Sequence, residues 1–209
     1  MEKNGKIFIQ IASYRDPELL NTIKDCIEKS DNPQNLVFGL CWQHSKDDKW
    51  DNLDEYLDDP RFKIVDVDFK ESKGACWARN SLQQQYDGEQ YTFQLDSHHR
   101  FIEGWDTELI NMLEGLIEKG HKKPLLTSYI SSYNPENDPE GRVNVPWLMN
   151  FDRFIPEGAV FFLPATIPNW ETLTEPVPAR FYSAHFAFSL GSFVEDVPHD
   201  PEYYFHGEE

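Results

Sequence analysis

Hydrophobic and polar positions alternate regularly through the first 125 residues, as short apolar runs separated by longer amphipathic segments. The apolar runs are rich in β-branched and aromatic residues, a composition typical of buried strands. They cover residues 6–12, 36–42, 62–69 and 91–95. The segments between them repeat apolar residues at helical spacing. They predict helices starting at Asp16–Pro17, over 74–86 and over 105–119.

This β-α-β-α order predicts an α/β fold, with a mixed, mostly parallel sheet and helices on both of its faces. Ligands of such sheets bind outside the carboxyl ends of the strands. The stretches of interest are therefore the polar segments that follow the strands. They are 13–16 (SYRD), 42–48 (WQHSKDD), 70–74 (KESKG) and 96–100 (DSHHR).

The pattern changes after residue 123, where eleven of the 14 prolines lie. Residues 131–158 show little periodicity, and we predict a long loop of the kind that forms lids or substrate clefts. Apolar runs return at 159–165 and 183–194. The last residues, YYFHGEE, look like the start of a helix with nothing behind it, which predicts that the natural chain continues.

Composition narrows the possible partners. The chain has 39% hydrophobic and 14% aromatic residues, enough for a sizeable core, and a formal net charge of −18. That charge disfavours nucleic acids and anionic membranes as partners, because both would be repelled. An anionic small ligand would need a local cation, either a basic side chain or a metal ion.

Cysteine usage and the N-terminus indicate the compartment. Three widely spaced cysteines, Cys26, Cys41 and Cys76, fit neither a disulfide framework nor a zinc ribbon, so we expect reduced, mostly buried thiols. The N-terminal apolar run is too short for a signal peptide or a membrane span. A cytoplasmic location is the natural expectation.

Asp96 and His98 carry the strongest chemical signal. They lie two residues apart just beyond a predicted strand, so in an extended chain their side chains point to one side. A carboxylate oxygen and an imidazole nitrogen suit Mn²⁺ better than Ca²⁺. The alternative is a polar turn in which the aspartate caps a helix.

The segment QLDSHHRFIEGW resembles the metal motif of GT-A-fold glycosyltransferases. The polypeptide N-acetylgalactosaminyltransferases carry Asp-Ser-His or Asp-Ala-His followed by Gly-Trp, matched here by Asp96, Ser97, His98, Gly104 and Trp105. The sequence is closer to the cytosolic N-acetylglucosaminyltransferases that modify hydroxyproline on an F-box adaptor protein, and to their bacterial relatives. Blocks such as IFIQIASYRDPEL, GACWARN and SAHFAFSLGSFVEDVPHDPEYYFHGEE resemble that family in the same order.

This resemblance implies a single GT-A domain over 1–209, with a nucleotide-binding half at 1–125 and an acceptor-side half at 126–209. The donor would be a UDP-sugar, in particular UDP-GlcNAc, and the reaction would retain the anomeric configuration. Asp96 and His98 would bind Mn²⁺, or Mg²⁺, against the diphosphate. The acceptor would be a hydroxyl group, either hydroxyproline or Ser/Thr of a protein, or a glycan.

The resemblance also suggests further site residues. Tyr14 would stack on uracil, Arg15 would reach a phosphate or Asp16, and Arg79 and Ser97 would contact the nucleotide. Glu208 or Glu209 would hydrogen-bond the sugar or the acceptor rather than act as a nucleophile. The structural alternatives are a rim aromatic for Tyr14, a helix cap for Asp16 and a first-turn glutamate pair at 208–209.

Relatives take a third metal ligand, a histidine, from beyond the equivalent of Glu209. His185 and His199 are the candidate substitutes, although lone histidines are more often packed or on the surface. We expect His99 and Arg100 to point away from His98, with Arg100 paired to an acid. The loop at 133–154, with Tyr133 and Trp147, is the predicted region of acceptor contacts, unless it is simply a surface loop.

Two other functions compete with the transferase interpretation. One is a metal-dependent phosphohydrolase built on Asp96, His98 and His99, although such enzymes usually need several separated motifs. The other is an inactive UDP-sugar-binding relative or fragment. The absence of a C-terminal helix from the sequence favours the second.

Overall fold

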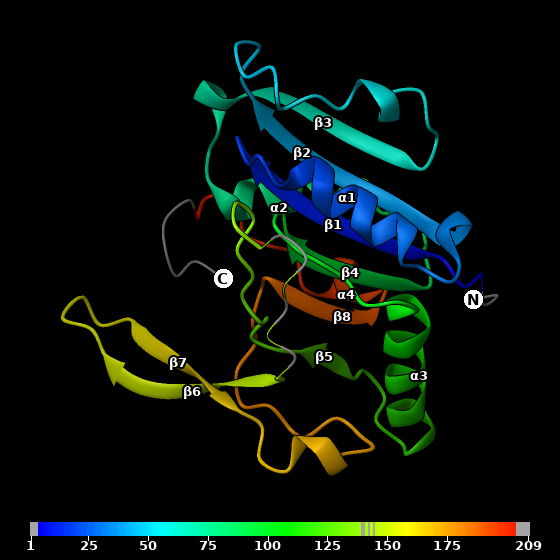
Figure 1. Cartoon of the computed structure of the whole chain (residues 1–209), viewed down its shortest axis with the longest axis vertical. Helices are drawn as coiled ribbons and strands as arrows, with labels where there is room; N and C mark the ends of the chain where they lie inside the picture. The colour runs from blue at the N-terminus through cyan, green and yellow to red at the C-terminus, as the bar shows by residue number, and fades with distance from the viewer. Residues whose placement is uncertain (1–3, 139–140, 142, 144, 204–209) are drawn as a thin grey trace.

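A computed structural model describes residues 4–138, 141, 143 and 145–203. Its strands are β1 (Ile7–Tyr14), β2 (Leu36–His44), β3 (Phe62–Asp68), β4 (Tyr91–Asp96), β5 (Leu125–Thr127), β6 (Trp147–Phe154), β7 (Val160–Thr166) and β8 (Phe186–Leu190). Its α-helices are α1 (Leu19–Glu28), α2 (Ala75–Gln83), α3 (Trp105–Glu118) and α4 (Phe193–Asp196). Figure 1 shows one sheet flanked by helices, and a two-stranded hairpin that projects away from it.

The predicted α/β fold is confirmed. The large sheet has six strands in the order β3-β2-β1-β4-β8-β5, and the β1–β2, β1–β4 and β2–β3 pairs are parallel. Strand β8 pairs antiparallel with both β4 and β5, so β5 runs in the same direction as β4 and β8 alone is reversed. The carboxyl ends of β1, β2, β4 and β5 therefore meet at one edge of the sheet.

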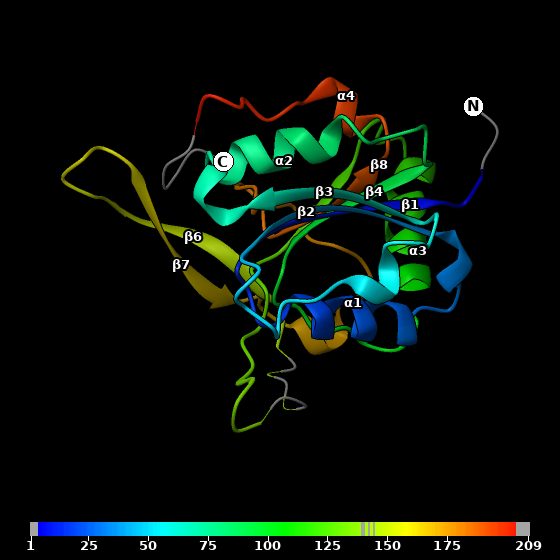
Figure 2. The ribbon, with the colours of Figure 1, turned by 90° about the horizontal axis from the view of Figure 1, so that it is seen from above.

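Helices cover both faces of this sheet, as predicted. Figure 2 shows α1 and α3 on one side and α2 with α4 on the other. The larger core lies under α1 and α3, where the alternate β1 residues Ile7, Ile9 and Ile11 pack with Ile23 and Leu113. On the opposite face, Phe8 packs with Val194, and Cys41 packs with Ala78 and Leu82 of α2. The central strands are buried on both faces, which is why they appear in the sequence as continuous apolar runs.

Helix α1 begins later than predicted, at Leu19 rather than at Pro17. Residues 17–18 form a turn, and Asp16 Oδ1 accepts a hydrogen bond from the backbone N–H of Glu18. Oδ1 of Asp16 thus stabilises the turn that precedes the helix. Oδ2 is bonded by residues that follow β4.

The prediction of a structureless loop over 131–158 is wrong for its second half, which contains β6. β6 pairs antiparallel with β7 around a turn in which Gly158 has a φ of 91°. The hairpin keeps several large apolar side chains exposed, including Phe151, Phe154 and Leu163. Because neither face is fully buried, its sequence lacks the alternation that identifies a half-buried strand.

Gly104 and Asp106 fix the start of α3 against the loop after α1. Gly104 has a φ of 68°, and a Cβ there would lie 3.1 Å from Asp31 Oδ2. Asp106 is buried and accepts hydrogen bonds from Ser30 Oγ at 2.7 Å and from the backbone N–H groups of Asp31 and Asn32 at 2.8 and 3.0 Å. Burial alone raises the pKa of Asp106, but these bonds outweigh burial and lower it below the ordinary value.

We expect the Asp106→Asn variant to lose about 2–3 kcal/mol of unfolding free energy at pH 7, because buried N–H donors would face an amide instead of a carboxylate. The folded-state pKa is depressed, so this stabilisation is present above the unfolded value near 4 and is lost as the pH falls through the folded pKa. Thermal unfolding from pH 7 to pH 3 should show the two proteins converging in acid. The exposed Asp58→Asn serves as control, and a pH-independent difference would contradict the prediction.

The cysteines are as expected: Cys26, Cys41 and Cys76 are all free and buried. Burial raises the pKa of the Cys41 thiol to about 12 and that of Cys26 well above its ordinary value. Within the described ranges, no helix combines the length and apolar character that crossing a membrane requires.

Candidate active site

The candidate site lies where β4 ends. Asp96 is the last residue of β4, and Ser97, His98 and His99 follow in the turn toward α3. The structure brings Asp96 and His98 together, with Asp96 Oδ2 and His98 Nε2 3.8 Å apart. The imidazole of His98 is exposed, and Asp96 is partly exposed. The two side chains therefore face one accessible region at the ligand-binding edge of the sheet.

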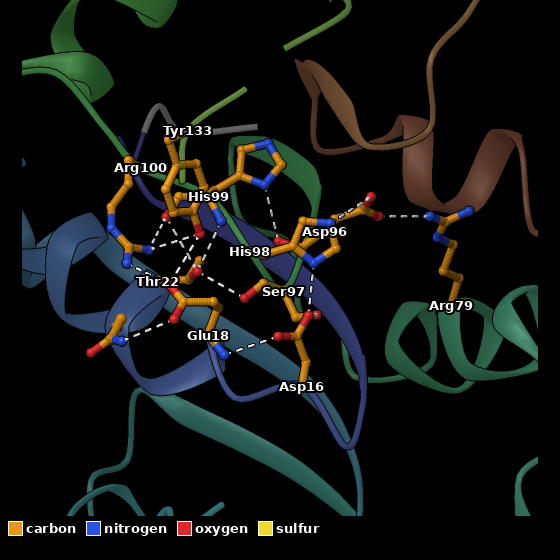
Figure 3. A network of polar contacts seen from close by, with 11 residues as sticks. Asp16, Glu18, Thr22, Arg79, Asp96, Ser97, His98, His99, Arg100 and Tyr133 are labelled. Atoms are coloured by element: carbon orange, nitrogen blue, oxygen red, sulfur yellow. Dashed lines mark hydrogen bonds and ion pairs between the residues drawn. The ribbon is translucent and has the colours of Figure 1, made fainter. Parts of the chain in front are cut away.

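Asp16 connects the loop after β1 to this pair. Its Oδ2 accepts hydrogen bonds from Ser97 Oγ at 2.6 Å and from His98 Nδ1–H at 2.7 Å (Figure 3). Burial raises the pKa of the Asp16 carboxyl, but the bonds from His98, Ser97 and the Glu18 N–H outweigh burial and lower it. The same contact raises the pKa of His98. Asp16 therefore fixes the imidazole with Nδ1 as the donor and Nε2 facing Asp96.

Arg79 lies on the other side of Asp96. It comes from α2, it is buried, and its Nη2 is 3.3 Å from Asp96 Oδ1. Figure 3 shows Asp96 between the guanidinium of Arg79 and the imidazole of His98. One carboxylate oxygen thus faces the fixed positive charge of Arg79, and the other faces Nε2 of the His98 imidazole. Arg79 thus lies beside Asp96, and its contact with a nucleotide stays a prediction.

The Asp96–His98 pair fits a divalent cation such as Mn²⁺ or Mg²⁺. A histidine that binds a metal usually donates its other ring N–H to a carboxylate, and His98 does so to Asp16. Mixed oxygen and nitrogen donors are typical of such ions, and sites completed by substrate phosphates need only one or two protein carboxylates. Across the part of the chain that the structure describes, no three or more His, Cys, Asp or Glu side chains are grouped to hold a metal. Among the described residues, Asp96 and His98 are the candidate ligands of this cation.

His99 does not join this pair. It is buried, its Nδ1–H donates to the backbone carbonyl of Asp96 at 3.1 Å, and burial lowers its pKa to about 3. Its Nε2 is buried and has no hydrogen-bond partner among the residues that the structure describes. The hydrolase alternative was built on Asp96, His98 and His99, and the structure turns the buried His99 away from the other two side chains.

Arg100 also points away from His98, as expected, and pairs with Glu18. Its guanidinium lies over the Tyr133 ring, 4.6 Å from the ring centroid, and Nη1 donates to Tyr133 Oη at 3.2 Å. Tyr133 Oη in turn donates to Glu18 Oε2 at 3.1 Å. This network ties the segment after β5 to the loops that follow β1 and β4. Tyr133 is therefore part of the site's supporting structure, and its hydroxyl is already engaged.

Tyr14 and Arg15 differ in their placement. Tyr14 is 54% exposed at the end of β1, where its ring contacts Phe69 edge to face. Arg15 has a φ of 48° and forms a bidentate ion pair with Asp48, at 2.6 and 3.0 Å. The expected contact between Arg15 and Asp16 is therefore wrong. The loop after β2 brings the carboxylate of Asp48 to the guanidinium of Arg15, and Asp16 instead bonds Ser97 and His98. A role of Arg15 toward a phosphate stays a prediction.

His185 and His199, the candidate third ligands, are engaged elsewhere. His185 lies within hydrogen-bond distance of Ser183 Oγ, and its Nε2 accepts from the backbone N–H of Ile130 at 3.3 Å. His199 Nε2 donates to Gln94 Oε1 at 2.8 Å. The structure thus brings neither to the Asp96–His98 pair. Glu208 and Glu209, the predicted catalytic carboxylates, lie outside the described residues.

Two participants were underestimated by the sequence interpretation. Asp16 was interpreted as a helix cap or a partner of Arg15, and Glu18 was not identified as a site residue. Both lie in the loop after β1, which is the segment that an α/β sheet places next to the end of β4. That adjacency was the available signal for both residues.

We expect Asp16→Asn to weaken Mn²⁺ binding by about 10- to 100-fold, the usual effect of removing the carboxylate behind a metal-binding histidine. Titration of the metal-free protein with Mn²⁺, followed by electron paramagnetic resonance of the free ion, would measure this. The control is Asp48→Asn, which removes an equal charge beside Arg15 at the same sheet edge. Equal affinities for both variants would contradict the assignment of Asp16.

Comparisons with known proteins agree with this geometry. The family model described as "Glycosyltransferase (GlcNAc)" matches residues 6–62 and 52–209. The sequence has no significant match among curated proteins.

Solved structures are similar at low sequence identity. The crystal structure of S. aureus TarS 1-349 superimposes with a TM-score of 0.57 at 12% identity, covering 97% of this chain and 52% of that one. This similarity supports the fold, and the chain spans about half of the TarS segment. The complex of the same S. aureus segment with UDP-GlcNAc gives a TM-score of 0.46 at 15% identity, covering 65% and 37% of the two chains. A score this low adds nothing to the argument.

Proposed function

Because this chain belongs to the glycosyltransferase (GlcNAc) family, we propose that it is a retaining, Mn²⁺- or Mg²⁺-dependent transferase that moves N-acetylglucosamine from UDP-GlcNAc to a hydroxyl acceptor. The observation that carries this proposal is the Asp96–His98 pair, held by Asp16 and faced by Arg79 at the end of β4. A UDP-sugar contains a diphosphate. A cation on Asp96 and His98, together with the guanidinium of Arg79, would bind it at this edge of the sheet.

Each side chain has a physical task in this proposal. Asp96 and His98 would hold the cation, and Asp16 would keep His98 in the tautomer that leaves Nε2 available. Arg79 supplies a fixed positive charge close to Asp96 in a chain whose net charge is −18. A bound divalent ion would supply electrostatic stabilisation for the charge that develops on the departing UDP.

The nucleoside would bind beside the end of β1. The exposed ring of Tyr14 is free to stack on uracil, whereas the predicted nucleotide contact of Ser97 is not supported, because its buried hydroxyl donates to Asp16 Oδ2. In a retaining reaction of this type the protein need not supply a nucleophile, so we propose that Glu208 or Glu209 orients the sugar or the acceptor. We propose 1–125 as the nucleotide-binding half and 126–209 as the acceptor-side half of one catalytic domain.

The acceptor hydroxyl belongs to a protein or a glycan, and hydroxyproline, serine and threonine are the candidate protein residues. The three free, buried cysteines support a reducing compartment, and we propose the cytoplasm.

The test is incubation with UDP-GlcNAc and Mn²⁺, with UDP release and the anomeric configuration of the released or transferred sugar followed by NMR. UDP-GalNAc and UDP-glucose serve as competing donors, and a chelator as the metal control. Metal-dependent consumption of UDP-GlcNAc above the other donors supports the proposal. Turnover that is unaffected by chelation contradicts the metal dependence, and consumption of none of the donors contradicts the activity.

A second candidate is a UDP-sugar-binding protein without turnover. It is favoured by the presence of only two protein ligands for the cation among the described residues. Calorimetry with UDP and Mn²⁺ separates the two candidates, because binding without consumption of UDP-GlcNAc would favour this second one.

A further inference from the structure

A cavity of about 510 Å³ lies between the end of β5 and the base of the β6–β7 hairpin. Its walls are Thr127, Ser128 and Tyr129 after β5, the first residues of β6, and the segment 176–181 that leads toward β8. Phe181 packs on Phe162 of β7, with ring centroids 4.5 Å apart, so the hairpin and this segment close the cavity together.

The cavity opens at the same sheet edge as the candidate site. Leu95 of β4 pairs with Phe186 of β8, and the next β8 residue, Ala187, pairs with Thr127 of β5. Since neighbouring strands lie about 4.8 Å apart, the ends of β4 and β5 are separated by roughly 10 Å. A molecule in the cavity would thus lie two strands away from a sugar whose diphosphate rests against Asp96.

Packed rings connect the two regions. Tyr129 contacts His185 edge to face at 4.9 Å and Trp147 at 6.3 Å between ring centroids. Tyr129 and Trp147 both line the cavity, and His185 Nε2 accepts a hydrogen bond from the backbone N–H of Ile130, the residue after Tyr129. The cavity wall is therefore continuous with the residues that support the site.

Charge distinguishes this cavity from the rest of the protein. The chain has 37 acidic residues, yet none of the described residues that line the cavity is an Asp or Glu, and Arg180 is the one charged residue among them. Arg180 is exposed, and it has no ion pair within the part of the chain that the structure describes. The other lining side chains are aromatic, aliphatic or neutral polar. A guanidinium without an ion pair, beside aromatic side chains, suits a ligand that carries an oxyanion on a ring or a polyol.

We propose that this cavity binds the acceptor, and that the acceptor is anionic, with a carboxylate or phosphate group held by Arg180. This inference rests on the proposed function for its place in the reaction, but the binding itself does not. A chain with a net charge of −18 repels an anionic acceptor at long range. The guanidinium of Arg180 in the cavity wall would offset that repulsion locally.

The experiment compares the binding of four matched sugars by saturation-transfer NMR, with UDP and Mn²⁺ present at saturating concentrations to fill the donor site, and again without them. Glucose 6-phosphate and glucuronate carry the two kinds of anion, methyl glucoside is neutral and glucosamine is cationic. We expect the better anion to bind the wild type about tenfold more tightly than methyl glucoside, the usual scale of a charge-assisted hydrogen bond. Tighter binding of glucose 6-phosphate would indicate a phosphate on the acceptor, and tighter binding of glucuronate would indicate a carboxylate.

Arg180→Gln should remove this preference, and Arg180→Lys should restore part of it. Arg153→Gln is the matched control, because Arg153 lies on the hairpin whose base lines the cavity, but it pairs with Asp152 and is not among the described lining residues. The inference is overturned if the wild type shows no preference for anions or binds none of the sugars, or if Arg180→Gln binds like the wild type. Failure of the proposed function would appear separately, as an absence of UDP binding with the anion preference intact.

Discussion

Replacement of Asp96 by asparagine is expected to lower the rate of sugar transfer from UDP-GlcNAc by about a thousandfold. The substitution keeps the shape of the side chain but removes the charge that faces both Arg79 and the proposed cation. Metal stabilisation of a leaving diphosphate contributes several kcal/mol, and each 1.36 kcal/mol corresponds to a factor of ten. The measurement is the initial rate of UDP release at saturating donor and Mn²⁺.

The matched control for this variant is Asp87→Asn. Asp87 is exposed and precedes β4, at the opposite end of the strand from Asp96, so the two substitutions change the net charge equally. We expect Asp87→Asn to retain the wild-type rate. Because Asp96 also neutralises the buried Arg79, the melting temperature of each variant is needed to show that the lost rate reflects the site and not unfolding. A rate within about threefold of the wild type for Asp96→Asn would exclude the proposed role of this carboxylate.

Substitution of Gly191 by alanine is expected to produce the largest loss of stability, about 3 kcal/mol or more. Gly191 follows β8 and donates its backbone N–H to the carbonyl of Gln90 at 2.8 Å. An added Cβ would lie 2.0 Å from the Glu89 carbonyl oxygen and 2.6 Å from Tyr86 Oη. Tyr86 itself donates to that carbonyl, so backbone and ring would have to move together. Overpacking of this kind usually costs about 1–3 kcal/mol, and more where backbone must shift.

The comparison variant is Gly115→Ala, within α3, where an added Cβ meets nothing within 4 Å. Alanine is favoured over glycine inside a helix by about 0.5–1 kcal/mol, so this variant should be slightly more stable than the wild type. For a chain of this size, 1 kcal/mol changes the melting temperature by about 2–4 °C. We therefore expect a fall of roughly 6–12 °C for Gly191→Ala and a small rise for Gly115→Ala in differential scanning calorimetry. A fall of under 2 °C for Gly191→Ala would contradict the close contact.

Most of the fold could be predicted from the sequence because buried strands and helices require apolar residues at characteristic positions. Strands β1, β2 and β4 are covered on both faces and appear as continuous apolar runs, while α3 carries its apolar residues at helical spacing. The strands that were missed show no such pattern of apolar residues. β5 has three residues, too few to show a period, and β6 exposes much of its apolar surface.

The Asp96–His98 motif of the candidate site could be predicted from the sequence, but the side chains that contact it could not. The spacing of Asp96 and His98 identified them as a pair, since alternate residues of an extended chain face one way. That Asp16 rather than Arg15 reaches His98 depends on how two loops meet in three dimensions. Arg15 turns toward Asp48 because its left-handed backbone conformation and the adjacent end of β2 place that carboxylate closest. Local sequence does not encode such a choice between acids.

The position of β8 has a consequence for synthesis on the ribosome. Strand β4 hydrogen-bonds along one side to β8, whose partner for Leu95 is Phe186, about 90 residues later in the chain. At typical translation speeds of about 5–20 residues per second, the nascent chain would carry an unpaired edge of Phe93 and Leu95 for roughly 5–20 s. Such an edge is a template for intermolecular pairing. A chaperone that engages emerging apolar strands would therefore act during the interval between translation of β4 and of β8.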